Sequence, residues 1–388
     1  MQQPIPYGHQ DISEEDIAAV EAVLRSDWLT QGPTVGNFER CVADYVGTPF
    51  GCAVTNATSA LHLACLAIGL EPGDTLWTVP NTFVASANAA LYCGAKVDFV
   101  DIDSATLNLS VSALEEKLVS AAREGALPKV VMPVHFGGLS CDMRAIARLA
   151  QRYGFRVIED ASHAIGGDYA NHKVGNCEYS DITVFSFHPV KIITTAEGGM
   201  LMTRNAALHE AALTLRSHGV TRDPARMDHE SEGAWYYQQI ALGFNYRITD
   251  IQAALGLSQM RRIDAFIARR RQLADRYDAA FVDFPVALPG RAADANSAWH
   301  LYVIQVDEQR AGKSRKTVFD ALRAAGIQVS VHYIPVHLQP YYRRLGFAAG
   351  DCPAAERYYA RAISLPMYAA LTNEQQDRVI AALRLALA

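Results

Sequence analysis

The chain contains, in this order, Lys129-Val-Val-Met-Pro-Val134, Met143-Arg-Ala-Ile-Ala-Arg-Leu-Ala-Gln-Arg-Tyr153 and Arg156-Val-Ile-Glu159. The first and third runs are short and apolar, as buried strands are, whereas the second has the apolar spacing of a helix. A helix that joins two strands forms a crossover, which makes the strands parallel and covers the sheet with helices. This stretch therefore predicts an α/β fold with a mainly parallel sheet sandwiched by helices.

The same alternation extends in both directions from this stretch. Further strands are predicted at Gly51–Thr55, Thr75–Val79, Lys96–Val100, Asp181–Phe187 and Gly199–Thr203, and further helices at Ser59–Ile68, Thr82–Leu91, Val111–Ala121 and Ala206–Ser217. Between them, Val220–Glu232 is a charged segment that we expect to be an irregular, mobile loop.

The pattern changes after residue 250. One long Arg-rich helix is predicted from Ile251 to about Phe281, followed by a strand at Ala298–Val306, a helix at Lys316–Ala325, a strand at Ile327–Val331 and helices near Ala354–Ser364 and Asn373–Ala388. The sequence thus predicts a large α/β domain over residues 1–250 and a smaller α+β domain over residues 251–388.

Composition excludes several classes of protein. Half of the 388 residues are hydrophobic and a fifth are charged, which is typical of a globular protein with a sizeable core. The 35 basic against 41 acidic residues argue against a nucleic-acid-binding protein. Seven cysteines without a CxxC pair indicate free thiols. The stretch Met1–Tyr7 lacks the basic and apolar pattern of a signal peptide, and no apolar run reaches the length of a membrane span. We expect a cytoplasmic protein with no membrane segment and no metal site.

The first candidate functional segment follows the strand at Gly51–Thr55. It reads Asn56-Ala57-Thr58-Ser59 and is predicted to begin a helix. Free N–H groups and the helix dipole at such a terminus favour a phosphate. The alternative is an ordinary helix cap provided by Thr58 or Ser59.

A second candidate segment, Asp160-Ala-Ser-His163, follows the strand at Arg156–Glu159. A carboxylate at the end of a buried strand requires a cation, which here would be an arginine, a metal or a protonated pyridine nitrogen. His163 lies near enough to flank the group that Asp160 holds. The alternatives are a structural ion pair for Asp160 and a hydrogen-bonded packing role for His163.

A third candidate is Lys191, in the segment that follows the strand ending near Ser186. The chain has seven lysines and 28 arginines, yet a lysine stands here among Pro189, Val190 and Ile192. Only a lysine can form an imine, and desolvation lowers its pKa and makes it a nucleophile. The alternative is a solvated loop lysine. A phosphate-binding helix terminus, an acid and an amine in this order together favour a pyridoxal phosphate site.

The sequence resembles the pyridoxal-phosphate sugar aminotransferases of fold type I, which have the aspartate aminotransferase-like fold and act on nucleotide-linked keto-sugars. The resemblance runs from Tyr7 to the carboxyl terminus. It rests on six motifs in order: Ala57-Thr-Ser-Ala-Leu61, Pro80-Asn-Thr-Phe83-Val-Ala-Ser-Ala-Asn88, Glu159-Asp-Ala-Ser-His163-Ala, Ser186-Phe-His-Pro-Val-Lys191 with Thr194-Thr-Ala-Glu-Gly-Gly199, Gly243-Phe-Asn245-Tyr-Arg247, and Val331-His-Tyr-Ile-Pro335.

The resemblance implies a role for each matching residue. Lys191 would bind the cofactor covalently, Asp160 would pair with its ring nitrogen, and Phe83 would stack on the ring. The cofactor-binding set implied is Ala57, Thr58, Ser59, Phe83, Asp160, His163, Ser186, Lys191 and Asn245, with Lys191, Asp160 and His163 as the catalytic residues. Because Asn245 would come from a second subunit, the resemblance also implies a homodimer with shared active sites.

The substrate contacts implied by the same resemblance are Tyr7, Asp27, Trp28, Leu29, Thr30, Arg247, His332 and Tyr333. Many family members carry Gln where this chain has His163. The Ser162-His163 version, with Arg216-Ser-His218-Gly219 and His332-Tyr333, most resembles the branch that aminates C4 of a UDP-linked 4-keto-6-deoxy-N-acetylhexosamine on the pseudaminic acid route. The amino donor would be L-glutamate.

The same residues bear on other functions. Another nucleotide keto-sugar, such as a GDP- or dTDP-4-keto-6-deoxyhexose, remains an alternative substrate. A sugar dehydratase on the same scaffold needs a base that forms no imine in place of Lys191. A non-catalytic regulatory protein on this fold would be expected to lack Lys191 or Asp160. A nicotinamide oxidoreductase would carry a GxGxxG fingerprint, which Asn56-Ala-Thr-Ser59 does not match.

Overall fold

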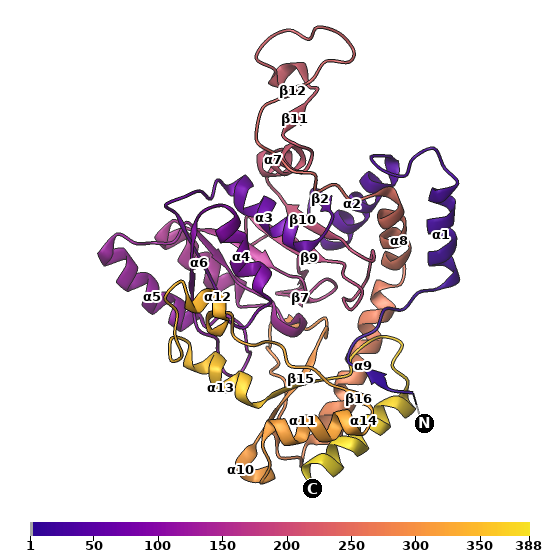
Figure 1. Cartoon of the computed structure of the whole chain (residues 1–388), viewed down its shortest axis with the longest axis vertical. Coiled ribbons are helices and arrows are strands. Elements are labelled where there is room, and N and C mark those ends of the chain that lie inside the picture. Colours follow the sequence, from indigo (N-terminus) through magenta and orange to yellow (C-terminus); the bar gives the residue numbers. More distant parts are fainter. Residues whose placement is uncertain (1–2) are drawn as a thin grey trace.

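A seven-stranded sheet lies at the centre of the computed structural model, which describes residues 3–388 (Figure 1). Its strand order is β2-β10-β9-β6-β5-β3-β4. The strands are β2 (Phe50–Val54), β3 (Thr75–Thr78), β4 (Lys96–Phe99), β5 (Val130–Met132), β6 (Arg156–Asp160), β9 (Ile182–Ser186) and β10 (Gly199–Thr203). β10 runs opposite to the other six strands. The link from β9 to β10 contains no helix to carry the chain across the sheet, so the strand turns back.

Helices cover both faces of this sheet, which confirms the predicted sandwich. They are α2 (Pro33–Val46), α3 (Ala57–Ile68), α4 (Val84–Tyr92), α5 (Val111–Glu124), α6 (Met143–Tyr153) and α7 (Ala206–Arg216). Alternate residues of a strand point to opposite faces. In β10, Leu201 packs into one core with Leu61 of α3, whereas Met200 packs into another with Phe38 of α2.

The C-terminal part has a core of its own, built from α9 (Ile263–Phe281), α11 (Arg315–Ala324), α14 (Asn373–Leu387) and the sheet β13-β15-β17. These strands are β13 (Val286–Ala287), β15 (Tyr302–Val306) and β17 (Ala362–Leu365). The first strand of the chain, β1 (Ile5–Pro6), pairs with β16 (Ile327–Gln328) of this part. The division at residue 250 stays a prediction, but this pairing joins the chain's beginning to the C-terminal part.

The predicted long helix from Ile251 to Phe281 is wrong in one respect, because it is two helices. α8 (Asp250–Met260) ends before α9 begins, and Arg262 between them leaves the helical conformation. Its guanidinium binds Asp11 at 2.9 Å and Asp16 of α1 (Glu14–Leu24) at 2.5 Å. These ion pairs stabilise the break.

Shorter elements complete the chain. They are α10 (Glu308–Ala311), α12 (Pro340–Arg343), α13 (Pro353–Arg361), 3-10 turns at Phe136–Gly138, Pro224–Arg226 and Val336–Leu338, and the small sheet of β7 (Asp168–Tyr169), β8 (His172–Lys173) and β14 (Ala295–Asn296). The helix predicted at Ala354–Ser364 gives way to β17 at Ala362. Between residues 3 and 388, no helix is long and apolar enough to cross a membrane.

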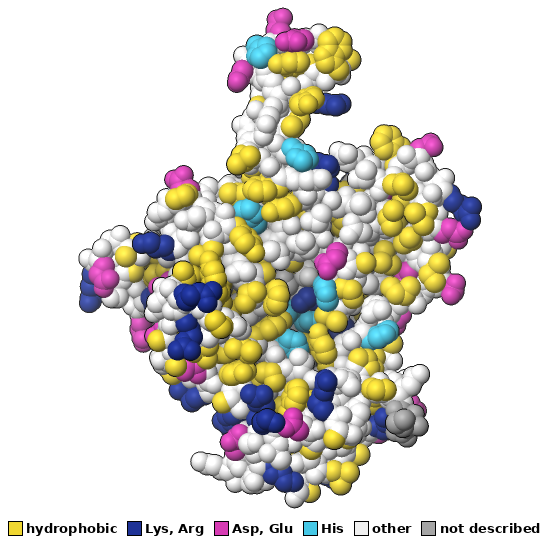
Figure 2. All heavy atoms as spheres, in the orientation of Figure 1, with side chains coloured by type: hydrophobic (Ala, Val, Ile, Leu, Met, Phe, Trp, Pro, Cys, Tyr) yellow, Lys and Arg dark blue, Asp and Glu magenta, His cyan; other side chains and the backbone are white. Residues whose placement is uncertain are grey.

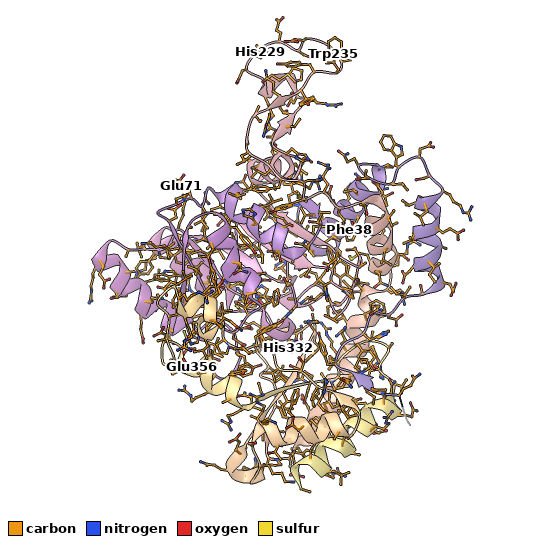
Figure 3. All side chains as sticks on the ribbon, viewed as in Figure 1. Phe38, Glu71, His229, Trp235, His332 and Glu356 are labelled. Carbon is orange, nitrogen blue, oxygen red and sulfur yellow. The ribbon has the colours of Figure 1, made fainter. Side chains whose placement is uncertain are left out.

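A hairpin arm projects from the body beyond α7 (Figure 1). Its strands are β11 (Val220–Thr221) and β12 (Gln238–Gln239), so the segment predicted as an irregular loop begins with a paired strand. His229 and Trp235 lie near its tip, where the Trp235 side chain is 72% exposed (Figure 3). The predicted mobility of this segment remains untested.

Candidate active site

A pocket of about 570 Å³ lies at the carboxyl ends of β6 and β9, beside the amino terminus of α3. His332 and Tyr333, from the C-terminal part, line its opposite wall. Histidine side chains gather at the centre of the face shown in Figure 2, and His332 lies in the middle of the molecule in Figure 3. Ligands bind at this end of the strands in open α/β sheets, so the fold and the pocket agree.

Lys191 enters the pocket from a tight turn directly after β9. Its N–H donates to the carbonyl of His188 at 2.9 Å, and the backbone of Thr195 binds the carbonyl of Phe187 at 3.0 Å, which closes the loop. Burial lowers the pKa of the Lys191 ammonium to about 8, and the nearby charge of Asp160 opposes this shift. About one tenth of the amine is therefore neutral at pH 7, far more than for a solvated lysine, and this fraction is available as a nucleophile or base.

Asp160 ends β6 with its carboxylate in the same pocket. Its Oδ2 accepts a hydrogen bond of 2.6 Å from Ser86 Oγ, and its Oδ1 accepts one of 3.1 Å from the Ser162 N–H. Both donors suit the charged carboxylate. Lys191 is the only lysine or arginine among the described residues that line the pocket, so Asp160 is placed to hold an incoming cation.

The amino terminus of α3 supplies backbone donors to the pocket. The helix cap is Asn56, not Thr58 or Ser59, and its Oδ1 accepts the Ser59 N–H at 2.8 Å. The Ser59 amide is therefore already bound, while the amides of Ala57 and Thr58 have no acceptor among the described residues. A phosphate would supply those acceptors and suit the helix dipole.

Gly199 allows β10 to begin directly against this terminus. A Cβ at residue 199 would lie 2.5 Å from the carbonyl carbon of Asn56 and 2.6 Å from the Ala57 nitrogen. No side chain can be accommodated at that distance. Gly199 of the Glu197-Gly-Gly199 motif thus permits β10, which pairs with β9 at Ser186, to lie close to the amino terminus of α3.

Phe83 caps the start of α4 and lies at the pocket, with 60% of its surface exposed. The ring is therefore not part of the hydrophobic core, where an aromatic residue in an apolar segment commonly lies. An exposed ring on a pocket wall buries its apolar surface when it stacks on the face of a flat ligand, which stabilises the bound ligand. Ser186, at the end of β9, lines the same pocket close to the α3 terminus.

His163, Tyr333, His332 and Tyr7 form the remaining polar wall. His163 Nε2 lies 3.1 Å from Tyr333 Oη, and His332 Nδ1 lies 2.7 Å from Ser364 Oγ. Burial, with the positive charge of Lys191, lowers the pKa of His332 to about 4 and that of His163 well below its usual value. Burial also raises the pKa of both tyrosines. All four side chains are therefore uncharged near neutral pH.

Several predicted residues lie outside this pocket. Ser59 is buried behind it and Asn245 is exposed, its backbone bridged to Ser217. Arg247 lines a separate hollow of about 240 Å³ with Arg216. The exposed segment Asp27, Trp28, Leu29 and Thr30 also lies away from the pocket, with Trp28 55% exposed. One chain therefore does not bring these residues to its own Lys191.

The structure adds residues that the sequence analysis did not single out. Ser86 holds Asp160, while His188, Glu197 and His300 line the pocket. His188 and Glu197 are in the quoted Ser186–Gly199 motif, so their position was a usable signal. The predicted strand at Ala298–Val306 contains His300, and only the tertiary fold brings this residue to the pocket.

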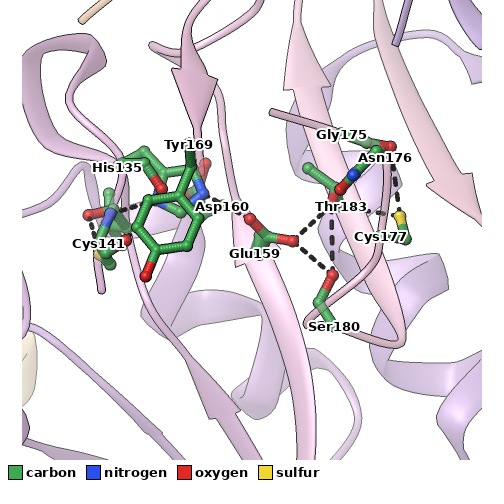
Figure 4. Close-up of polar contacts among 12 residues, drawn as sticks. His135, Cys141, Glu159, Asp160, Tyr169, Gly175, Asn176, Cys177, Ser180 and Thr183 are labelled. Carbon is green, nitrogen blue, oxygen red and sulfur yellow. Dashed lines mark hydrogen bonds and ion pairs between the residues drawn. The ribbon is translucent and has the colours of Figure 1, made fainter. Parts of the chain in front are cut away.

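A buried polar network lies beside Asp160 on the opposite face of β6 (Figure 4). Glu159 accepts hydrogen bonds from His135 Nε2 at 2.6 Å, from Thr183 Oγ1 at 2.9 Å and from the Ser180 hydroxyl. These donors lower the pKa of Glu159 and keep it charged despite its burial. The network ties β6 to β9 immediately behind the two strand ends that carry Asp160 and Ser186.

The residues present fit pyridoxal phosphate. Two unpaired amides at a helix terminus suit its phosphate, a hydrogen-bonded carboxylate suits its ring nitrogen, and a lysine of lowered pKa faces both across one pocket. Fold and site together define a pyridoxal-phosphate-dependent aminotransferase of fold type I.

Comparison with known proteins specifies the class. The chain belongs to the DegT/DnrJ/EryC1/StrS aminotransferase family, whose profile matches residues 10–384. It is 41% identical to the spore coat polysaccharide biosynthesis protein SpsC of Bacillus subtilis, over 98% of this chain and 96% of that protein.

Solved structures agree with this assignment. Helicobacter pylori PseC, an aminotransferase involved in the biosynthesis of pseudaminic acid, superposes with a TM-score of 0.91 at 30% identity, covering 99% of both chains. Spr1654 from Streptococcus pneumoniae, solved in PLP and PMP forms, superposes with a TM-score of 0.88 at 29% identity, covering 99% of this chain and 98% of that one. The protein is thus a sugar aminotransferase that uses pyridoxal phosphate, as the sequence predicted.

Proposed function

We propose that this enzyme transfers the amino group of L-glutamate to C4 of a UDP-linked 4-keto-6-deoxy-N-acetylhexosamine, the substrate class of the pseudaminic acid route. The observation that carries the proposal is the uncharged polar wall facing Lys191, made of Tyr7, His163, His332 and Tyr333. Neutral donors and acceptors suit the hydroxyl and carbonyl groups of a sugar. The similarity to PseC, and the Ser162-His163 and His332-Tyr333 motifs, support the same choice.

A second candidate is another nucleotide keto-sugar, such as a GDP- or dTDP-4-keto-6-deoxyhexose. The observation that favours it is the 41% identity to a protein named for spore coat polysaccharide biosynthesis, which is higher than the 30% identity to PseC. Both candidates require the same chemistry at C4 and differ in the nucleotide and in the ring substituents.

In the proposed mechanism, each chain's residues hold the ligands and move protons. Pyridoxal phosphate supplies the electron sink that carbanion chemistry needs. Lys191 Nζ removes a proton from the amino-bearing carbon of the donor and later delivers a proton to C4 of the sugar from one side. Asp160 would hold the positive charge at the ring nitrogen, Phe83 would cover the ring, and Ala57, Thr58 and Ser186 would bind the phosphate. Amine acceptance and delivery at one site predict ping-pong kinetics.

The proposal also includes a homodimer with shared active sites. Asn245, Arg247 and the segment Asp27–Thr30 lie outside the pocket of their own chain and are exposed or half-buried. We infer that they complete the pocket of a second copy, where Asn245 would bind the phosphate and Arg247 the carboxylate of the donor.

The seven free cysteines support a reducing, cytoplasmic setting as part of the same proposal.

Single-half-reaction spectroscopy tests the substrate. The holoenzyme is first converted with L-glutamate, and UDP-, GDP- and dTDP-linked 4-keto-sugars are then added separately while the cofactor absorbance is followed. We expect the UDP-linked N-acetylated sugar to restore the lysine-bound spectrum fastest, with an amino-sugar product confirmed by mass. A clear preference for a GDP- or dTDP-linked sugar would overturn the UDP assignment and support the second candidate.

A further inference from the structure

The two ring nitrogens of His163 have different partners. The N–H of Gly137 donates to Nδ1 at 3.3 Å, and Nε2 lies 3.1 Å from the hydroxyl of Tyr333. A backbone N–H can only donate, so Nδ1 must accept. A neutral imidazole that accepts at Nδ1 carries its proton on Nε2.

The surroundings of His163 keep the ring neutral. It is buried, and the ring of His300 packs against it with 4.4 Å between centroids. Burial lowers the pKa of His163, and the positively charged Lys191 and His332 are close enough to disfavour a second proton further. Two carboxylates line the pocket: Asp160, whose partners are Ser86 Oγ and the Ser162 N–H, and Glu197, which makes no hydrogen bond with His163. No described carboxylate therefore competes for the His163 proton through a hydrogen bond.

This tautomer sets the direction of the bond to Tyr333. The Nε2–H of His163 donates, so the hydroxyl oxygen of Tyr333 accepts and its own proton must point elsewhere. Tyr333 lines the pocket, and its hydroxyl donates to no other group among the described residues. Burial and the charge of Asp160 raise the pKa of this phenol, so it stays protonated.

We propose that Gly137, His163 and Tyr333 form a directional hydrogen-bond relay that presents the Tyr333 hydroxyl as a donor to an oxygen of the bound ligand. His163 is then a positioning residue, and Tyr333 is the residue that contacts the ligand. The acceptor is an oxygen of either the cofactor ring or the sugar. The proposal builds on the proposed function, because it assumes that both ligands bind in this pocket.

The relay requires one acceptor and one donor on the side chain at position 163. Glutamine provides both on one planar amide, whereas glutamate only accepts when charged and leucine does neither. His163→Gln should therefore preserve the relay better than His163→Glu or His163→Leu. A purely steric role would predict no such order, since glutamine and glutamate have nearly the same shape.

The tautomer can be measured directly on the protein without substrate. In a long-range ¹H–¹⁵N spectrum of ¹⁵N-histidine-labelled apoenzyme at neutral pH, the pattern of His163 reports which ring nitrogen carries the proton. His163→Gln identifies the signal by its loss. We expect a neutral ring protonated on Nε2. A ring protonated on Nδ1, or on both nitrogens, would overturn the relay.

Variants of Tyr333 identify the acceptor. Tyr333→Phe should weaken its ligand roughly ten- to hundredfold, the usual effect of losing one hydrogen bond to a polar or charged group. A rise in the dissociation constant of pyridoxal phosphate for apoenzyme would place the acceptor on the cofactor. A rise in KM or fall in kcat confined to the sugar half-reaction would place it on the substrate. No change in either measurement would overturn the proposal.

A double-mutant cycle separates the relay from general damage. If His163 acts through Tyr333, His163→Leu should add little to the loss caused by Tyr333→Phe, whereas independent effects would multiply. Circular dichroism checks that each variant folds, and His163→Gln serves as the conservative replacement. If the wild type accepts none of the offered keto-sugars, the proposed substrate fails, while the tautomer and the cofactor affinity still test the relay.

Discussion

The hydroxyl of Ser86, in the first turn of α4, donates a hydrogen bond of 2.6 Å to Oδ2 of Asp160 at the end of β6. Because α4 also carries Phe83 at its cap, one helix start positions both the carboxylate and the ring that faces the pocket. Ser86→Ala should lower turnover about tenfold, since a hydrogen bond to a charged group is lost. The rate of the L-glutamate half-reaction measures this effect.

The matched control is Ser120→Ala, which removes an exposed hydroxyl bound to Glu124 on α5, far from the pocket residues. Ser86→Ala should also unfold at a somewhat lower urea concentration than Ser120→Ala, because only Ser86 loses a buried hydrogen bond. Equal half-reaction rates in the two variants would mean that Ser86 does not support Asp160.

Asn56 links helix capping to phosphate binding. Asn56→Ala removes the acceptor of the Ser59 N–H and should destabilise the start of α3 by about 1 kcal/mol. The adjacent amides of Ala57 and Thr58 would be less well ordered, so the affinity for pyridoxal phosphate should fall. Asn205→Ala provides the control, because Asn205 caps α7 in the same way without lining the pocket. A loss of cofactor affinity in both variants would contradict a specific role for Asn56.

Site residues could be predicted from the sequence where the pattern that identifies them is local in the chain. Lys191, Asp160 and the α3 terminus were predictable because each directly follows an apolar strand, and parallel strands bring their ends to one edge. Ser59 was predicted as a phosphate ligand, but its amide is bound to the Asn56 side chain. The sequence alone does not decide which of the neighbouring polar residues caps the helix. Ser86 and Asp160 lie in two of the quoted motifs, but those motifs are far apart in the chain and neither indicates that the two side chains meet.

The C-terminal part shows the same limit. The helix break at Arg262 depends on ion pairs with Asp11 and Asp16 near the chain's beginning. The helical pattern that begins near Ala354 did not indicate β17, which forms a strand because it pairs with β15. Both the helix break and the strand depend on partners far away in the chain, whereas the sequence provides only the local periodicity of apolar residues.

The lowered pKa of Lys191 predicts the pH dependence of cofactor attachment. Burial disfavours the ammonium, so the neutral amine predominates above pH 8. The rate at which apoenzyme forms the absorbance band of the lysine-bound cofactor should therefore rise with pH and level off above about 8. Asp160→Asn should move this midpoint lower, because the charge that raises the pKa is removed.

Lys191→Ala checks the identity of the amine, since it should bind the cofactor without forming that band. Borohydride reduction followed by peptide mapping should place the label on Lys191 alone. A label on any of the other lysines, or a midpoint near the ordinary lysine value, would contradict the role given to Lys191.

Glu159 should contribute to stability more than to chemistry. Glu159→Leu would leave the donors of His135, Ser180 and Thr183 buried without their acceptor, at a cost of about 3 kcal/mol or more. Urea unfolding measures the change, with Glu115→Leu as the control at an exposed ion pair. Equal stability of the two variants would show that the network behind the sheet is dispensable.

Subunit complementation tests the shared active site. Lys191→Ala chains and Asn245→Asp chains should each be inactive, the first without the amine and the second with a negative charge facing the cofactor phosphate. If Asn245 serves the partner's pocket, a heterodimer combines both lesions in one site and leaves the other site intact. About half of the heterodimer's sites should then be active, as counted for a twofold dimer.

The control pairs Lys191→Ala with Asp160→Asn. Both residues line the pocket of one chain, so each site of that heterodimer carries one lesion and no activity should return. Mass spectrometry verifies that subunits exchange in both mixtures. If exchange occurs and the Asn245→Asp mixture stays as inactive as the control, Asn245 acts within its own chain and the pocket is not shared.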